Sequence, residues 1–165
     1  MVATGTPNQI IAAIATANLD LQKTYKAEIT IPKKKRSLDA NGYYWLLLHR
    51  FAEWARVSDT WVHNDILARF GQPAQIEGRP MYLVMVDSPA YKELSYIHLK
   101  PTSELKEGND GKLYRTFVVM RGSHEYDTAE FSRLVDGLIQ DIQGSGAPIE
   151  TMTPAELAAL KGYAA

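Results

Sequence analysis

The feature that most constrains the fold is a long helical pattern of large apolar residues between residues 38 and 56. These residues recur at spacings of three and four, which places them on one stripe of a helix; they are Tyr44, Leu47, Leu48, Phe51, Trp54 and Ala55. A second helical pattern follows over residues 59–70, where Ser58 is placed to cap the helix and Gly71 to end it. Two amphipathic helices in succession predict a helical hairpin whose apolar faces need a further layer to cover them.

The middle of the chain has the sequence patterns of strands. Residues 81–86 form an uninterrupted apolar run, which predicts a buried strand, and residues 113–121 predict another. Residues 95–100 alternate, with Ile97 and Leu99 on one face, and a polar connection over 100–112 ends in a turn signal at 109–111. An earlier alternation over residues 25–31 predicts one more strand.

Three capping boxes mark further helix starts. They pair Thr6 with Gln9, Asp127 with Glu130, and Thr153 with Glu156. The first predicts a helix to about residue 18, the second a long helix from residue 128, and the third a short helix from residue 154. The sequence therefore predicts an α+β fold: a small antiparallel or mixed sheet with a long helical hairpin and two C-terminal helices packed on it, in a single domain over residues 1–165.

Composition excludes several classes of protein. The 165 residues carry a formal net charge of -1, so nucleic-acid binding would need a local basic patch rather than a globally basic surface. The absence of cysteine excludes disulfides, thiolate zinc sites and thiol nucleophiles. No segment has the length of a membrane span or the pattern of a signal peptide, which predicts a cytoplasmic protein. No nucleotide-binding or cofactor fingerprint is present.

A basic run leads directly into the first long helix of the hairpin. Residues Lys33, Lys34, Lys35 and Arg36 can displace counterions from a nucleic-acid backbone. On the helix itself a second stripe, beside the apolar one, carries Asn41, Trp45, His49 and Arg56. An aromatic ring that stacks on bases, next to cations that hold phosphates, is typical of single-stranded nucleic-acid binding. The alternative is that Trp45 is the edge of the core and the other residues of the stripe are solvated.

The segment 121–127 joins a predicted strand to a well-capped helix, a place where anions dock and catalytic groups are often carried. Arg121, Ser123 and His124 are candidates to contact a phosphate. An ordinary turn is the simpler interpretation. His124, Glu125 and Asp127 also allow a metal-dependent nuclease, and a third possibility is a small protein that captures a host factor or a nucleotide through this turn.

The run Arg36-Ser37-Leu38-Asp39-Ala40-Asn41 followed by Trp45 resembles the signature of the phage NinB (Orf) recombination proteins. The stretch 117–123, with Glu130 and Phe131 behind it, is similar to a later strand, turn and helix start of that family. The resemblance covers residues 7–56 and 114–143, whereas residues 57–113 depart from the family. It implies a non-enzymatic recombination mediator of a bacteriophage that binds single-stranded DNA and the host single-strand-binding protein, as a homodimer enclosing a channel.

These observations combine into one hypothesis, a single-stranded-DNA-binding accessory protein without catalytic residues, metal or cofactor. The predicted DNA-binding residues are Lys33, Lys34, Lys35, Arg36, Asn41, Trp45, His49, Arg56, Arg121, Ser123 and His124.

Overall fold

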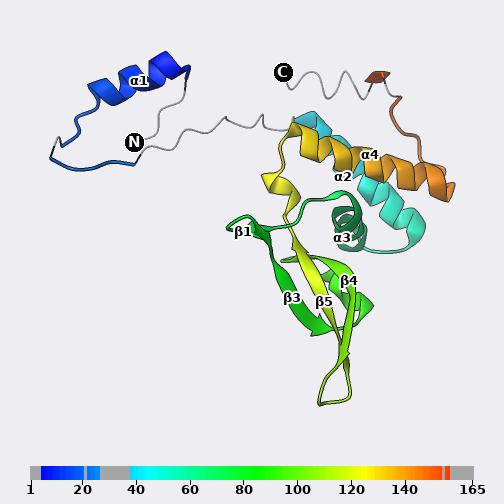
Figure 1. The fold of residues 1–165 in the computed structure, drawn as a ribbon. Coiled ribbons are helices and arrows are strands. Elements are labelled where there is room, and N and C mark those ends of the chain that lie inside the picture. Colours follow the sequence, from blue (N-terminus) through cyan, green and yellow to red (C-terminus); the bar gives the residue numbers. More distant parts are fainter. Residues whose placement is uncertain (1–4, 21, 27–37, 154, 157–165) are drawn as a thin grey trace. The chain divides into compact units, whose positions relative to one another are not determined.

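A computed structural model describes residues 5–20, 22–26, 38–153 and 155–156 (Figure 1). The chain divides into two compact units, residues 1–32 and residues 33–165. The expectation of a single domain over residues 1–165 stays a prediction.

The first unit contains one helix, α1 (Pro7–Thr16), within its described residues. The capping box is confirmed: the Thr6 amide donates to Gln9 Oε1 at 2.8 Å, and the Gln9 amide donates to Thr6 Oγ1 at 3.5 Å. Pro7 occupies the first helical position, where its missing N–H costs nothing. The helix ends two residues earlier than expected. Most of the strand predicted over residues 25–31 lies outside the described residues.

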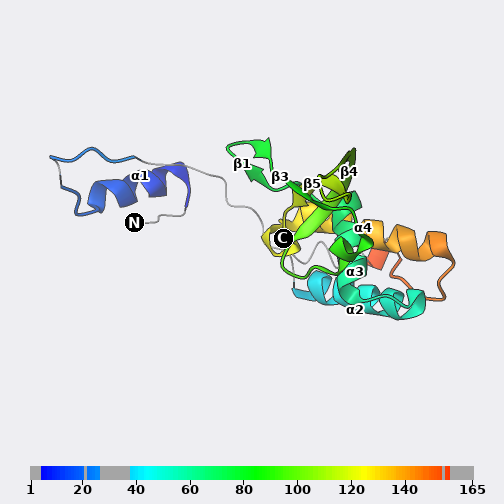
Figure 2. The ribbon, with the colours of Figure 1, turned by 90° about the horizontal axis from the view of Figure 1, so that it is seen from below.

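The second unit is built around three helices that pack on one another, α2 (Leu38–Ala55), α3 (Asp59–Phe70) and α4 (Thr128–Ser145) (Figures 1 and 2). Their shared core includes Tyr44, Leu47, Leu48, Ile66, Leu67, Phe131, Leu134 and Leu138. The predicted α+β class, the packing of the two hairpin helices and the Ser58 cap, which accepts from the Trp61 amide at 2.9 Å, are confirmed. None of the described helices combines the length and apolar character needed to cross a bilayer.

The end of α2 corrects one expectation. The helix stops at Ala55, and Arg56 adopts a left-handed conformation with φ of 56°. The Arg56 amide donates to the Glu53 carbonyl at 3.2 Å, and the Val57 amide donates to the Ala52 carbonyl at 3.0 Å. This is the Schellman pattern of a helix C-terminus, a position that glycine usually fills. Arg56 therefore lies beyond the helix and is not on the predicted stripe.

A three-stranded antiparallel sheet lies beside the helices, in the order β3 (Tyr82–Val86), β5 (Leu113–Met120), β4 (His98–Glu107). A small hairpin, β1 (Gln75–Ile76) with β2 (Arg79–Pro80), precedes it. Two short 3₁₀ helices, η1 (Pro89–Glu93) and η2 (Ser123–Glu125), follow β3 and β5. The central strand β5 matches the prediction for residues 113–121, and Phe117 on it is fully buried.

Two strand predictions are wrong in part. The apolar run 81–86 does form a strand, but β3 is an edge strand with exposed side chains rather than a buried one. The segment 101–107, expected to be a connection, instead continues β4. Its Pro101 and alternating charges read as a loop, yet an edge strand tolerates both because one side of its backbone faces solvent. The predicted turn follows it, with Gly111 at φ of 73°.

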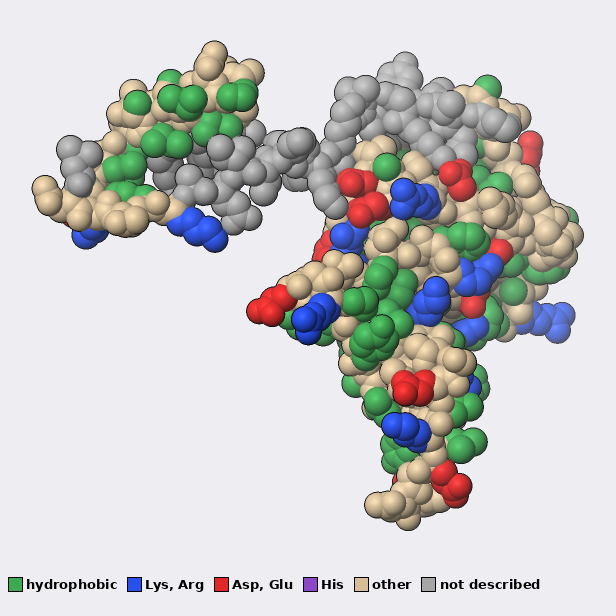
Figure 3. All heavy atoms as spheres, in the orientation of Figure 1, with side chains coloured by type: hydrophobic (Ala, Val, Ile, Leu, Met, Phe, Trp, Pro, Cys, Tyr) green, Lys and Arg blue, Asp and Glu red, His purple; other side chains and the backbone are tan. Residues whose placement is uncertain are grey.

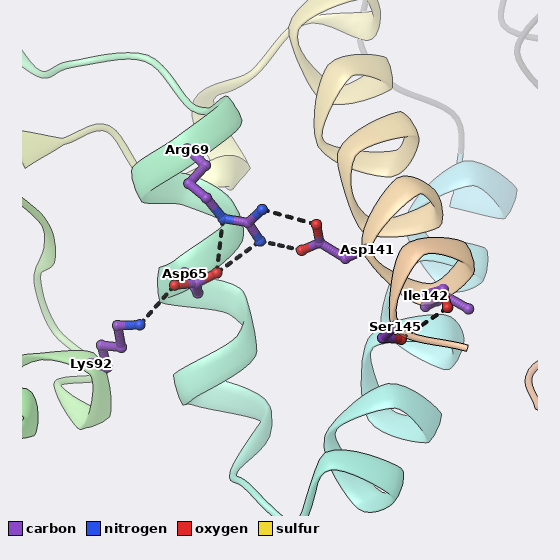
Figure 4. A network of polar contacts seen from close by, with 6 residues as sticks. All are labelled: Asp65, Arg69, Lys92, Asp141, Ile142 and Ser145. Atoms are coloured by element: carbon purple, nitrogen blue, oxygen red, sulfur yellow. Dashed lines mark hydrogen bonds and ion pairs between the residues drawn. The ribbon is translucent and has the colours of Figure 1, made fainter. Parts of the chain in front are cut away.

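Ion pairs join α3 to α4 and to η1 (Figure 4). The Arg69 guanidinium makes a two-pronged contact with Asp141 on α4 and also bonds Asp65 Oδ2 at 2.9 Å. Lys92 on η1 pairs with the other oxygen of Asp65 at 2.7 Å. Nearby, Ser145 donates to the Ile142 carbonyl at 2.9 Å in the last turn of α4. These contacts join α3 both to α4 and to η1, the connection between β3 and β4.

Candidate nucleic-acid interface

A row of aromatic rings crosses from the helices to the sheet. Trp45 on α2 lies with its ring centroid 4.8 Å from that of His63 on α3, and His63 lies 5.4 Å from His98 on β4. Trp45 is 38% exposed, whereas His63 is only 7% exposed and His98 is half-buried. The exposed Trp45 ring therefore rests on a buried support, an arrangement that holds a stacking surface rigid.

Two buried side chains, Tyr44 and Ser123, contact the ring nitrogens of His63. The Tyr44 hydroxyl lies 2.9 Å from His63 Nδ1, and Ser123 Oγ lies 3.5 Å from His63 Nε2. Tyr44 is fully buried, and its burial raises the pKa of the phenol far above the neutral range. The hydroxyl therefore keeps its proton and remains a hydrogen-bonding anchor for the histidine.

His98 has a defined tautomer. Asn64 donates through Nδ2 to the carbonyls of Lys92 at 2.8 Å and Leu94 at 2.9 Å, which identifies its other atom as the amide oxygen. That oxygen lies 2.6 Å from His98 Nδ1, so the ring nitrogen donates to it. In the neutral ring Nε2 is then an acceptor. Burial, with a smaller effect from His124, lowers the pKa of His98 and favours this neutral form.

The turn after β5 adds a third histidine to the row. A methyl group at Gly122 would lie 2.7 Å from two atoms of the His124 ring and 3.8 Å from His98 Nε2. The missing side chain of Gly122 thus lets the His124 ring fold back beside His98. The His124 side chain is 77% exposed. We call Trp45, His63, His98 and His124 the ring row.

The positive charges predicted in this turn are compensated by acids. Arg121 forms an ion pair with Glu130 at 2.5 Å, approaches Glu125 at 3.9 Å and lies 4.7 Å over the Tyr126 ring. The contact with Glu130 is the largest of the effects that raise the pKa of Arg121. A phosphate would have to compete with Glu130 for this guanidinium. Ser123 is buried, 6% exposed, and faces His63 rather than solvent.

The other residues of the predicted stripe on α2 have different surroundings from Trp45. His49 is exposed, but its ring nitrogens lie 3.1 Å from Asp59 and 3.7 Å from Glu53. Asn41 is partly buried, and its Oδ1 makes no hydrogen bond within the described residues. Arg56 is exposed but lies beyond the helix. The basic run Lys33, Lys34, Lys35 and Arg36 falls outside the described residues.

The metal-site alternative lacks a suitable ligand set in the described part of the chain. Asp127 caps α4, accepting from the Glu130 amide at 2.9 Å, and His124 lies 3.5 Å from Glu125. Across residues 5–20, 22–26, 38–153 and 155–156, no three acidic or histidine side chains gather as a metal ion would need.

Lys100 adds a further cation near the row, because it lies two residues after His98 on the same face of β4.

Sequence reasoning missed His63, His98 and Asn64. It placed Tyr44 correctly in the core but did not predict its hydrogen bond to His63. The one local signal was that His63 and Asn64 fall among apolar residues on the inner side of α3. His98 gave no signal, because its neighbours in space come from distant parts of the chain. Comparison of the chain with protein-family models, with curated proteins and with solved structures found no match.

Proposed function

We propose that this protein binds single-stranded DNA and acts as a non-enzymatic accessory factor in recombination of phage type. The observation that carries the proposal is the ring row: the exposed Trp45 ring lies against the buried His63, His63 lies against the half-buried His98, and the exposed His124 lies near His98 at Gly122. Unpaired bases stack on such rings whatever their sequence, and a neutral Nε2 accepts a hydrogen bond from a base edge.

Two groups of cations are proposed to bind phosphates. One is Lys100, which has no acidic partner among the described residues, and the other is the basic run, which lies outside the described residues. Lys100 is exposed beside the row, and Lys33 to Arg36 immediately precede the helix that carries Trp45. The resemblance of residues 36–45 to the NinB signature supports the same function. It also makes a host single-strand-binding protein the proposed protein partner.

The proposal is tested by fluorescence anisotropy with a labelled oligothymidylate at low salt. Trp45→Leu keeps an apolar side chain over His63 but removes the stacking ring, so we expect roughly 5- to 150-fold weaker binding. Trp54→Leu is the matched control, because Trp54 is a similarly exposed tryptophan of α2 that stacks on Phe51 instead. Equal affinities of both variants and the wild type would refute the role of the row.

A salt titration tests the basic run separately. Neutralising Lys33, Lys34, Lys35 and Arg36 to glutamine is expected to lower the slope of log affinity against log salt by about 3. An unchanged slope would remove these residues from the interface.

Incubation of the same DNA with magnesium or manganese checks the nuclease alternative, for which cleavage is the required result.

A further inference from the structure

The two edges of the sheet differ in a way that indicates what each one meets. The edge strand β4 carries the features that keep an edge unpaired: charged side chains, a proline and an irregularity in its pairing between Pro101 and Leu105. Its charged residues are Lys100, Glu104, Lys106 and Glu107. The β4 edge is therefore suited to face solvent.

The opposite edge has none of these features. Strand β3 reads Tyr-Leu-Val-Met-Val, without a charge, a proline or a break in its pairing with β5. Tyr82 is 61% and Val84 62% exposed. In Figure 1 β3 is the outer strand beside β5, and in Figure 3 hydrophobic side chains gather over its start, next to the β1–β2 hairpin. An apolar, unprotected edge of this kind pairs with another strand when one is available.

The backbone of β3 presents its free groups in a regular pattern. The Met81 carbonyl accepts from the Val119 amide and the Asp87 amide donates to the Leu113 carbonyl, so these two residues face β5. In an antiparallel ladder alternate residues face opposite sides, which turns the amides and carbonyls of Tyr82, Val84 and Val86 outward. No described residue bonds these outward groups.

This edge is complementary to itself. If a two-fold axis passes through Val84, an antiparallel pairing places Val84 opposite Val84, Tyr82 opposite Val86, and Leu83 opposite Met85. Every outward amide then meets an outward carbonyl of the other copy, because the three outward residues pair among themselves. Each cross-strand pair is apolar, and the aromatic residue meets a β-branched one, a favourable combination. No like charges face each other.

We propose that two copies of this protein associate through β3, whose strands pair antiparallel about Val84 and join the two sheets into one. The partner we propose is a second copy rather than a foreign peptide, because β3 already matches an identical β3 in its backbone groups and in its side chains. The interface contains no residue of the ring row. The proposal therefore goes beyond DNA binding, and each can fail while the other holds.

Two opposite substitutions at Val84 test the register. Because residue 84 meets its own copy, Val84→Lys places two cations face to face and Val84→Glu two anions. Each variant alone is expected to weaken the dimer at least about tenfold. Mixing the two is expected to restore it, because lysine then faces glutamate. The side chain is mostly exposed, so the fold tolerates both changes, which circular dichroism and thermal melting check.

The measurement is light scattering coupled to size exclusion, on the full chain across micromolar concentrations. Leu105→Lys is the matched control, since Leu105 is 43% exposed on the other edge strand, and it is expected to stay dimeric. A monomeric wild type would overturn the proposal. So would a Val84→Lys variant that is as dimeric as the wild type, loss of the dimer in Leu105→Lys, or a mixture of the two charged variants that stays monomeric.

Discussion

The hydrogen bond between Tyr44 and His63 gives a sharp test of how the core supports the ring row. Tyr44→Phe removes one oxygen and leaves the ring, which packs edge-on against Phe131 with centroids 5.3 Å apart. The lost contact is the 2.9 Å bond to His63 Nδ1, between groups that are 0% and 7% exposed. Leaving a buried polar group unpaired costs about 1–3 kcal/mol, and we expect the free energy of unfolding to fall by that amount.

Urea unfolding followed by circular dichroism measures this loss, with the dependence on urea unchanged because the same surface is exposed. Tyr43→Phe is the control. The Tyr43 hydroxyl accepts from the Met152 amide at 2.7 Å but is only half-buried, so water replaces it and the expected cost is below about 1 kcal/mol. Equal stability of Tyr44→Phe and the wild type, or losses no larger than in Tyr43→Phe, would refute the reasoning.

Three further predictions concern stability. Arg56→Gly should stabilise the protein by about 1 kcal/mol in urea unfolding, because glycine adopts the left-handed conformation without strain; destabilisation would contradict the Schellman assignment. A double-mutant cycle with Arg69→Ala and Asp141→Ala should give a coupling of about 1 kcal/mol or less that shrinks in high salt, since the Arg69 side chain is 44% exposed; a coupling indifferent to salt would argue against an ion pair. Because the pKa of His98 is lowered in the folded protein, the unfolded chain takes up this proton at a higher pH than the folded protein does. The stabilisation that neutral His98 gives the folded protein is therefore fully present above pH 6.5 and is lost as the pH falls through the pKa of the folded protein. His98→Gln should therefore flatten the decline of the urea midpoint between about pH 7 and pH 5, and an unchanged decline would exclude His98 as its source.

Local signals allowed most of the helices to be predicted. The capping boxes at Thr6 and Asp127 and the Ser58 cap each depend on residues a few positions apart, and each was found in the structure. The burial of β3 could not be predicted, because an apolar run does not reveal whether its strand is central or at an edge. That property depends on strand order, which long-range pairing decides. Pro101 predicted a loop in place of the second half of β4, because the sequence does not reveal that β4 is an edge strand, where a proline is tolerated.

The candidate site was predicted only in part. Trp45 and His124 were identified from their local surroundings, but the histidines between them were not. His63 and His98 are 35 positions apart and meet only because α3 packs on the start of β4. Likewise, the acidic partners of Arg121 and His49 became visible only in three dimensions, since Asp59 comes from the next helix.

The central claim, that single-stranded DNA stacks on Trp45, is tested most directly by the fluorescence of this residue alone. A variant with Trp54 and Trp61 replaced by phenylalanine leaves Trp45 as the one tryptophan of the chain. Titration with an oligothymidylate should quench its emission with the same midpoint that anisotropy of the labelled DNA reports. Binding by anisotropy with no change in the emission of Trp45 would contradict the proposed interface.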